Sequence, residues 1–139
     1  MLKIPERVNL AIHSLAYIVA QNNNKPIPVS DIARNLAVSE SHLAKVMQRL
    51  VKVGLVYSTR GAGGGFVLKK NPDTITLMDV YECIEGPLSL PDCLLSKPLC
   101  KPGDCLLKGM FEESYKVIVR HMTKTRISDF RAIDKQAPA

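Results

Sequence analysis

Four cysteines are the residues of this sequence with the most distinctive chemistry, and three of them are closely spaced. Cys93, Cys100 and Cys105 lie within thirteen residues, whereas Cys83 lies ten residues upstream. Thiolates that a folded loop brings together are common ligands of iron–sulfur clusters and of zinc. The segment lacks the paired Cys-X-X-Cys motif of a zinc ribbon, which favours a cluster over zinc. Free thiols and a redox-active disulfide are the remaining interpretations.

The three closely spaced cysteines fall in residues 87–105, a segment predicted to be an irregular sensor loop. It holds four prolines, which prevent regular structure, and a loop of this length is usually functional or disordered. The side chains expected to shield a bound group from water are Leu94, Leu95, Leu99 and Leu106. Cys83 falls instead on the apolar side of a predicted helix, so a buried and inert thiol is expected there.

A long amphipathic helix is predicted over Leu106–Thr123, directly after this loop. Its apolar stripe consists of Leu107, Met110, Phe111, Val117, Ile118 and Met122. One small head cannot cover a stripe of this extent, which predicts that the helix pairs with the same helix of a second chain. We therefore expect a homodimer, with the dimerisation helix and a C-terminal tail over residues 106–139.

Residues 38–68 predict a winged helix-turn-helix. Ser39–Val53 has apolar residues at helical spacing on one side and polar, mostly basic side chains on the other. Gly54 is expected to end this helix, and Leu55–Tyr57 and Phe66–Leu68 have the composition of strands joined by a glycine-rich loop. A basic helix of this kind fits a DNA major groove, and two strands with such a loop form a wing.

The polar face of the helix and the wing supply the candidate DNA contacts. Side chains near the helix start can reach base edges, and small wing residues allow close approach to the minor groove or the backbone. The candidate DNA-binding residues are Ser39, Glu40, Ser41, His42, Lys45, Gln48, Arg49, Ser58, Arg60, Gly63 and Gly64. Two such heads in a dimer predict a near-palindromic operator in double-stranded DNA.

The distribution of charge supports this interpretation. The net charge of +6 divides into +7 for residues 1–70, with ten Lys or Arg and three Asp or Glu, and −1 for residues 71–139, with nine and ten. Positive charge concentrated in the half that contains the recognition helix indicates polyanion binding. A winged helix that binds a protein is the alternative, and it predicts no steep salt dependence. No pair of catalytic groups has recognisable spacing, so an enzyme is the least supported class.

No membrane span or secretion signal is evident in the sequence. The apolar run Leu10–Ala20 is too short to cross a bilayer, and the segments of a signal peptide do not occur in their usual order. We therefore expect a cytoplasmic protein without a membrane partner, in which a metal or redox site is favoured over structural disulfides. Two disulfides would be the interpretation for a secreted protein.

The remaining predicted elements complete a mainly α fold with a small β-wing. The further helices are Ile4–Gln21, Asp31–Leu36 with Ser30 as its cap, Leu77–Ile84 and Ile127–Ile133. Thr76 and Asp79 have the spacing of a capping box at the start of the third of these helices. Residues 1–86 are thus expected to form the winged helix-turn-helix head with its linker helix.

Four short motifs carry a resemblance to a known family. They are SESHL at 39–43, LVKVGLV at 50–56, RGAGGGF at 60–66 and TLMDV at 76–80. They resemble the recognition helix, wing and linker helix of the Rrf2 family of bacterial regulators, and the wing motif is the most specific. The resemblance covers nearly the whole chain and implies a homodimeric transcription regulator. In IscR-like and NsrR-like members, a three-cysteine loop binds a 2Fe–2S or 4Fe–4S cluster, which responds to redox state, nitric oxide or iron.

The resemblance also implies a set of cluster ligands. Cys93, Cys100 and Cys105 match the three-cysteine loop, with spacings of six and four residues in place of the commonest five and five. Lys108 stands where IscR-like members have histidine, and a protonated lysine is a poor ligand. Some relatives use the first helix of the partner subunit, at positions that correspond to Asn9 and His13. His13 is thus implied as the further metal ligand, with a helix-surface or dimer-contact histidine as the alternative.

Overall fold

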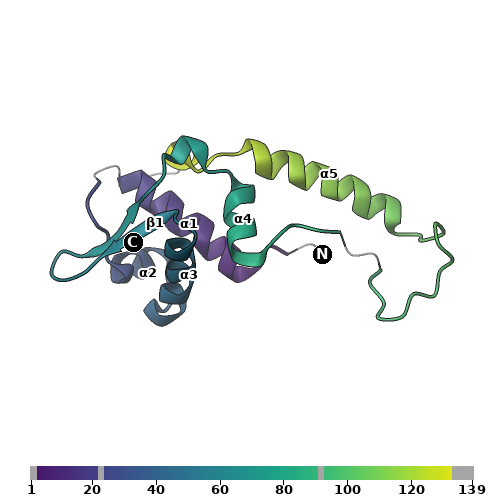
Figure 1. Cartoon of the computed structure of the whole chain (residues 1–139), viewed down its shortest axis with the longest axis horizontal. Coiled ribbons are helices and arrows are strands. Elements are labelled where there is room, and N and C mark those ends of the chain that lie inside the picture. Colours follow the sequence, from purple (N-terminus) through teal and green to yellow (C-terminus); the bar gives the residue numbers. More distant parts are fainter. Residues whose placement is uncertain (1–2, 22–23, 91–92, 133–139) are drawn as a thin grey trace.

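The computed structural model describes residues 3–21, 24–90 and 93–132, and consists of helices with one small sheet (Figure 1). The elements are α1 Glu6–Gln21, α2 Val29–Leu36, α3 Glu40–Lys52, β1 Val56–Thr59, β2 Gly65–Leu68, η1 Pro72–Thr74, α4 Leu77–Glu85, α5 Lys108–Lys124 and η2 Ile127–Ala132. This confirms the predicted fold class, mainly α with a β-wing. None of the described helices is both long and apolar enough to cross a membrane.

The core of the head forms around α1, which packs against α2, α3, α4 and η2. Its buried side chains recur at helical spacing, as Val8, Ala11, Leu15 and Ile18 show. The apolar stripe of α3 faces this helix, and its members Leu43, Val46, Met47 and Leu50 are buried as predicted. This packing leaves the opposite, polar face of α3 at the surface.

The helix α2 begins earlier than predicted, and the assignment of Ser30 as its cap is wrong. The helix starts at Val29, and Pro28 provides the carbonyl that accepts from Asp31 N at 3.1 Å. Proline already has the φ angle of a helix start, so it replaces a side-chain cap and places Ser30 inside the helix. Ala37, with a positive φ of 55°, then makes the tight turn that leads into α3.

The wing is an antiparallel hairpin, in which Val56 pairs with Leu68 and Thr59 pairs with Gly65. Its second strand also exchanges two backbone hydrogen bonds with Ile27, through the N–H and the carbonyl of Phe66. Ile27 lies two residues before the start of α2, so the wing is attached to the beginning of the helix-turn-helix. The first strand begins one residue and ends two residues later than predicted, whereas the second begins one residue earlier and ends at Leu68 as predicted.

The predicted capping box at the start of α4 is confirmed. The Thr76 hydroxyl accepts from Asp79 N at 3.0 Å, and the Asp79 carboxylate accepts from Thr76 N at 2.8 Å. At the other end of α4 the chain turns at Gly86, as expected.

The long helix α5 extends away from the head, and the cysteine loop lies at the opposite end of the molecule from the wing (Figure 1). The helix begins at Lys108, two residues later than predicted, because residues 105–107 form a turn. At its other end the chain returns to the head, where Ile127 is buried and its N–H donates to Ile75 O at 2.9 Å. The last predicted helix is a 3-10 helix, and its predicted final residue, Ile133, lies outside the described residues.

Candidate DNA-binding surface and cysteine loop

The exposed face of α3 carries the side chains predicted to contact DNA. The seven predicted residues of this segment are all exposed: Ser39, Glu40, Ser41, His42, Lys45, Gln48 and Arg49. Donors and acceptors thus face outward from the first turns of a helix whose other face is anchored in the core. This is the geometry that a helix needs to present side chains to base edges in a major groove.

Two contacts at the start of α3 were not predicted. The Ser39 hydroxyl accepts from His42 N at 3.2 Å and so caps the helix. The imidazole Nε2 of His42 lies 4.0 Å from Oε1 of Glu6, at the start of α1. The Ser39 cap was detectable from residue type and position, whereas nothing in the sequence indicates that Glu6 approaches α3.

Arg49 differs from the other predicted DNA contacts. Its Nε donates to the carbonyl oxygen of Cys83, near the end of α4, at 3.0 Å. The structure therefore places Arg49 at the edge of α3 that faces α4 and already assigns it a partner within the chain. A second arginine, Arg7 of α1, pairs with the carboxylate of Glu85 in the same turn of α4.

The predicted wing residues lie at the loop between the strands. Ser58, Arg60 and Gly63 are exposed and Gly64 is half-buried. A Cβ on Gly64 would lie 2.5 Å from the carbonyl oxygen of Thr59, so the loop itself requires glycine there. Gly63 and Arg60 remain available for the predicted approach to DNA.

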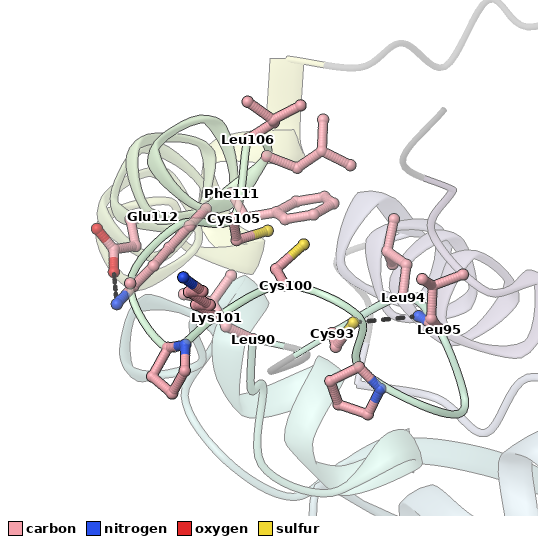
Figure 2. Close-up of a pocket in the computed structure, with 15 residues that line it drawn as sticks. Leu90, Cys93, Leu94, Leu95, Cys100, Lys101, Cys105, Leu106, Phe111 and Glu112 are labelled. Atoms are coloured by element: carbon pink, nitrogen blue, oxygen red, sulfur yellow. Dashed lines mark hydrogen bonds and ion pairs between the residues drawn. The ribbon is translucent and has the colours of Figure 1, made fainter.

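The three predicted cysteine ligands line one cavity of about 530 Å³ at the start of α5 (Figure 2). Figure 2 shows the sulfur atoms of Cys100 and Cys105 pointing toward the same space. Cys93 Sγ accepts a hydrogen bond from Leu95 N at 3.4 Å. All four cysteines of the chain are free thiols in the structure.

The walls of the cavity are largely apolar, but the expected shielding by four leucines is only partly correct. Leu94, Leu95 and Leu106 line the cavity, whereas Leu99 does not. All four leucines are exposed in the single chain, from 52% for Leu95 to 98% for Leu106, so none of them excludes water from the cavity. Phe111 was predicted only as part of the apolar stripe of the long helix, but it is half-buried and supplies an aromatic wall of the cavity from α5.

The donor set of this cavity fits an iron–sulfur cluster. Three thiols are the ligands that such clusters use, apolar walls control their exposure, and an N–H···S hydrogen bond of the Cys93 kind tunes their potential. The thiols share a cavity without being gathered at one point, since the described residues contain no group of three Cys, His, Asp or Glu side chains in position to hold a metal ion.

The other predicted or excluded ligands lie elsewhere. His13 is exposed on α1, where Nδ1 lies 2.8 Å from the carbonyl oxygen of Asn9, and it does not line the cavity. The ligand set with His13 therefore requires a second chain. Lys108 does line the cavity, with Nζ 3.8 Å from Oε1 of Glu112. Cys83 is half-buried on α4, as expected in part, and burial raises the pKa of its thiol against the opposing effect of Arg49.

Comparisons with known proteins identify the family. The family model of Rrf2, an iron-dependent transcriptional regulator, matches residues 4–132. The chain belongs to the Rrf2 family. It is 34% identical over 134 residues to an HTH-type transcriptional regulator of Aquifex aeolicus, a match that covers 94% of this chain and 92% of that protein. It is 30% identical over 116 residues to the HTH-type regulator NsrR of Bacillus licheniformis, which covers 78% and 81% of the two chains.

Solved structures agree with this assignment. CymR, the global cysteine regulator of B. subtilis, superposes with a TM-score of 0.81 at 26% identity, covering 97% of this chain and all of that chain. The resemblance of the four motifs to Rrf2 regulators is thus confirmed. As a member of this family the protein is a DNA-binding transcription regulator and not an enzyme.

Proposed function

We propose that this Rrf2 regulator is a homodimer whose affinity for near-palindromic operator DNA is switched by an iron–sulfur cluster held by Cys93, Cys100 and Cys105. The observation that carries the proposal is that the three thiols line a single cavity with largely apolar walls. Cysteines that serve only packing behave as small hydrophobic side chains and are not expected to line one cavity together.

The DNA side of the proposal is supported by exposure and charge. Ser41, His42 and Lys45 extend from the first turns of α3, where a helix in the major groove meets base edges. Arg60 at the wing is available for the adjacent minor groove or backbone. The excess of positive charge in residues 1–70 attracts the phosphates around these contacts.

The dimer is supported by the uncovered side of α5. Leu107, Met110 and Val117 are exposed by 43%, 55% and 59%, and each belongs to the predicted apolar stripe. A second copy of the helix would cover these side chains and would bring the two recognition helices into one molecule. Two heads on one dimer need two half-sites, which explains the near-palindromic operator.

The residues around the cavity indicate how the loop would respond. A bound cluster supplies a group sensitive to redox state, nitric oxide or iron supply. The three cysteines hold the loop around it, Leu95 N–H stabilises negative charge on Cys93 Sγ, and Phe111 shields one side. To reverse a two-state population almost fully, the free energy of cluster binding would have to differ between the two states by about 5.5 kcal/mol.

A second candidate is a regulator that senses thiol oxidation without a cluster. The free state of the four cysteines and the exposure of Cys100 favour it. The structural likeness to CymR, named as a cysteine regulator, is compatible with either candidate. A structural zinc ion is a weaker alternative, because the loop lacks a paired Cys-X-X-Cys motif.

The decisive experiment is anaerobic purification followed by reconstitution with iron and sulfide. We expect iron, acid-labile sulfide and visible absorption in the wild type, loss of all three in Cys93→Ser, Cys100→Ser and Cys105→Ser, and retention in Cys83→Ser. Binding is then measured on a duplex selected from a random pool, before and after chelation and across salt concentrations. A colourless reconstituted protein would refute the cluster, and peroxide-dependent DNA binding in that protein would favour the thiol sensor.

A further inference from the structure

The last turn of α4 is held by two arginines that come from other helices. Arg49 of α3 donates through Nε to the carbonyl oxygen of Cys83 at 3.0 Å. Arg7 of α1 pairs with both carboxylate oxygens of Glu85, with Nη2 2.9 Å from Oε2. Cys83 and Glu85 are both among the last three residues of α4, so the two arginines hold the same turn. We call this pair of contacts the α4 clamp.

The α4 clamp meets a need that α4 cannot meet itself. The last carbonyls of a helix lack partners within the helix, and the negative end of the helix dipole favours nearby cations. The last turn of α4 has no basic residue and contains Glu82 and Glu85. Arg49 satisfies one of the carbonyls, and the Glu85 pair raises the pKa of Arg7 while lowering that of Glu85. Both contacts therefore place a cation at the negatively charged end of α4, and one of them also satisfies a terminal carbonyl.

The clamped turn leads directly into the cysteine loop. Gly86 ends α4, and two residues later the carbonyl oxygen of Leu88 accepts from the Tyr115 hydroxyl of α5 at 3.1 Å. Cys93 follows five residues after Leu88. The end of α4 is thus hydrogen-bonded to the recognition helix, and five residues later along the chain the entry to the loop is hydrogen-bonded to α5.

We propose that Arg49 is a positioning residue that fixes the recognition helix α3 to the end of α4, in place of the DNA contact expected from its sequence position. We further propose that the α4 clamp is the joint through which the cysteine loop alters the placement of α3, a step that rests on the proposed function. A guanidinium whose Nε already donates within the chain is not free to adopt whichever pose a phosphate requires.

Two substitutions at this position separate the roles. In Arg49→Gln the amide nitrogen occupies the place of Nε along the side chain, so a donor to Cys83 O is retained while the charge is lost. In Arg49→Lys the charge is retained, but a methylene group replaces Nε. Lys52→Gln, which removes an exposed charge from the same helix, is the matched control.

Binding is measured on metal-free, reduced protein with a duplex selected by the wild type from a random pool. We expect Arg49→Gln to bind as Lys52→Gln does and Arg49→Lys to bind about tenfold more weakly. We also expect faster hydrogen exchange across residues 80–88 in Arg49→Lys alone. Wild-type affinity in Arg49→Lys, or a salt slope lowered by about one unit only in Arg49→Gln, would show a phosphate contact and overturn the positioning role.

The joint is tested by the ratio of DNA affinities with and without bound iron and sulfide. In Arg49→Lys this ratio is expected to move toward one while iron and sulfide contents stay at wild-type values. Glu85→Gln, which releases Arg7 without altering α3, is expected to do the same if Arg49→Lys folds poorly. An unchanged ratio in either loaded variant overturns the joint. A ratio of one in the wild type would refute both the proposed switch and the joint. The positioning role of Arg49 would still be decided by the binding measurements on metal-free protein.

Discussion

Ser39 shows how a residue of the DNA-binding surface can be needed for the fold before it is needed for recognition. Its side-chain oxygen accepts from His42 N, which satisfies one of the donors that the first turn of α3 leaves unpaired. The same residue is exposed and was predicted to read a base. Its effect on DNA binding must therefore be separated from its effect on the helix that carries Lys45 and its neighbours.

Two substitutions of Ser39 make this separation. Ser39→Ala removes the cap and is expected to lower the free energy of unfolding by about 1 kcal/mol. Ser39→Asp keeps a capping oxygen at the positive end of the helix dipole, so stability should be retained. Its added negative charge should nevertheless weaken DNA binding. Urea unfolding and binding to the selected duplex measure the two effects, and unchanged stability in Ser39→Ala would contradict the capping role.

At the scale of elements, the wing depends on its contact with the start of α2. Phe66 exchanges two backbone hydrogen bonds with Ile27. These bonds bring the two backbone segments so close that Gly65 has no room for a side chain. A Cβ at Gly65 would lie 2.3 Å from the carbonyl carbon of Ile27, and its φ of +154° is one that other residues rarely adopt. The glycines of the wing motif thus serve the fold as well as any approach to DNA.

Gly65→Ala is therefore expected to destabilise the protein by about 1–3 kcal/mol, the usual range for an overpacked site. Gly109→Ala is the control, because a Cβ there meets nothing within 4 Å and the position lies in α5. It should stabilise the helix by roughly 0.5–1 kcal/mol. Thermal unfolding of both variants gives the comparison, and equal stability of the two would show that the Ile27 contact is absent.

The pairing of α1 with α4 has a pH dependence whose sign is fixed. The Arg7 guanidinium lowers the pKa of Glu85 in the folded protein, so the pair stabilises the fold above the ordinary pKa of glutamate. That stabilisation is lost as the pH falls through the lowered pKa. Glu85→Gln should therefore lose less stability than the wild type between about pH 6 and about pH 3. Glu82→Gln, outside this pair, should follow the wild type, and a parallel loss in all three proteins would refute the pair.

Sequence patterns predicted most elements because their determinants are local. The apolar stripe of α3, the capping box of Thr76 and Asp79, and the glycine-rich hairpin each depend on residues within a few positions of one another. Their close spacing in the sequence likewise predicted that three cysteines belong to one loop, and they line one cavity. Reasoning from local patterns failed where the determinant was distant in the chain, since nothing near Arg49 reveals that α4 covers that edge of α3. It also misjudged the burial of the four leucines around the cysteines, because an irregular loop has no periodicity from which to predict burial.

At the scale of the whole molecule, the head and the cysteine loop lie at opposite ends of the long axis, connected by α4 and α5 (Figure 1). A single chain leaves most of α5 without cover, although its C-terminal Met122 is buried against the head. The head is therefore closed around its own core, while the rest of the helix presents an apolar face. This division separates folding of the head from the proposed pairing of two chains, so that a substitution can disrupt the pairing without unfolding the head.

Val117→Glu uses this division to test the proposed dimer. Val117 is 59% exposed in the single chain, so a glutamate there costs the head nothing, but it places charge in an apolar contact between two copies of α5. Sedimentation should show two chains for the wild type and one for the variant, with unchanged helical content. The variant should bind a single half-site with the affinity of the wild type. It should lose the increase in affinity that the wild type shows when two half-sites are joined in one duplex. Lys116→Glu, an exposed neighbour, should remain dimeric; a dimeric Val117→Glu would show that the chains pair through another surface.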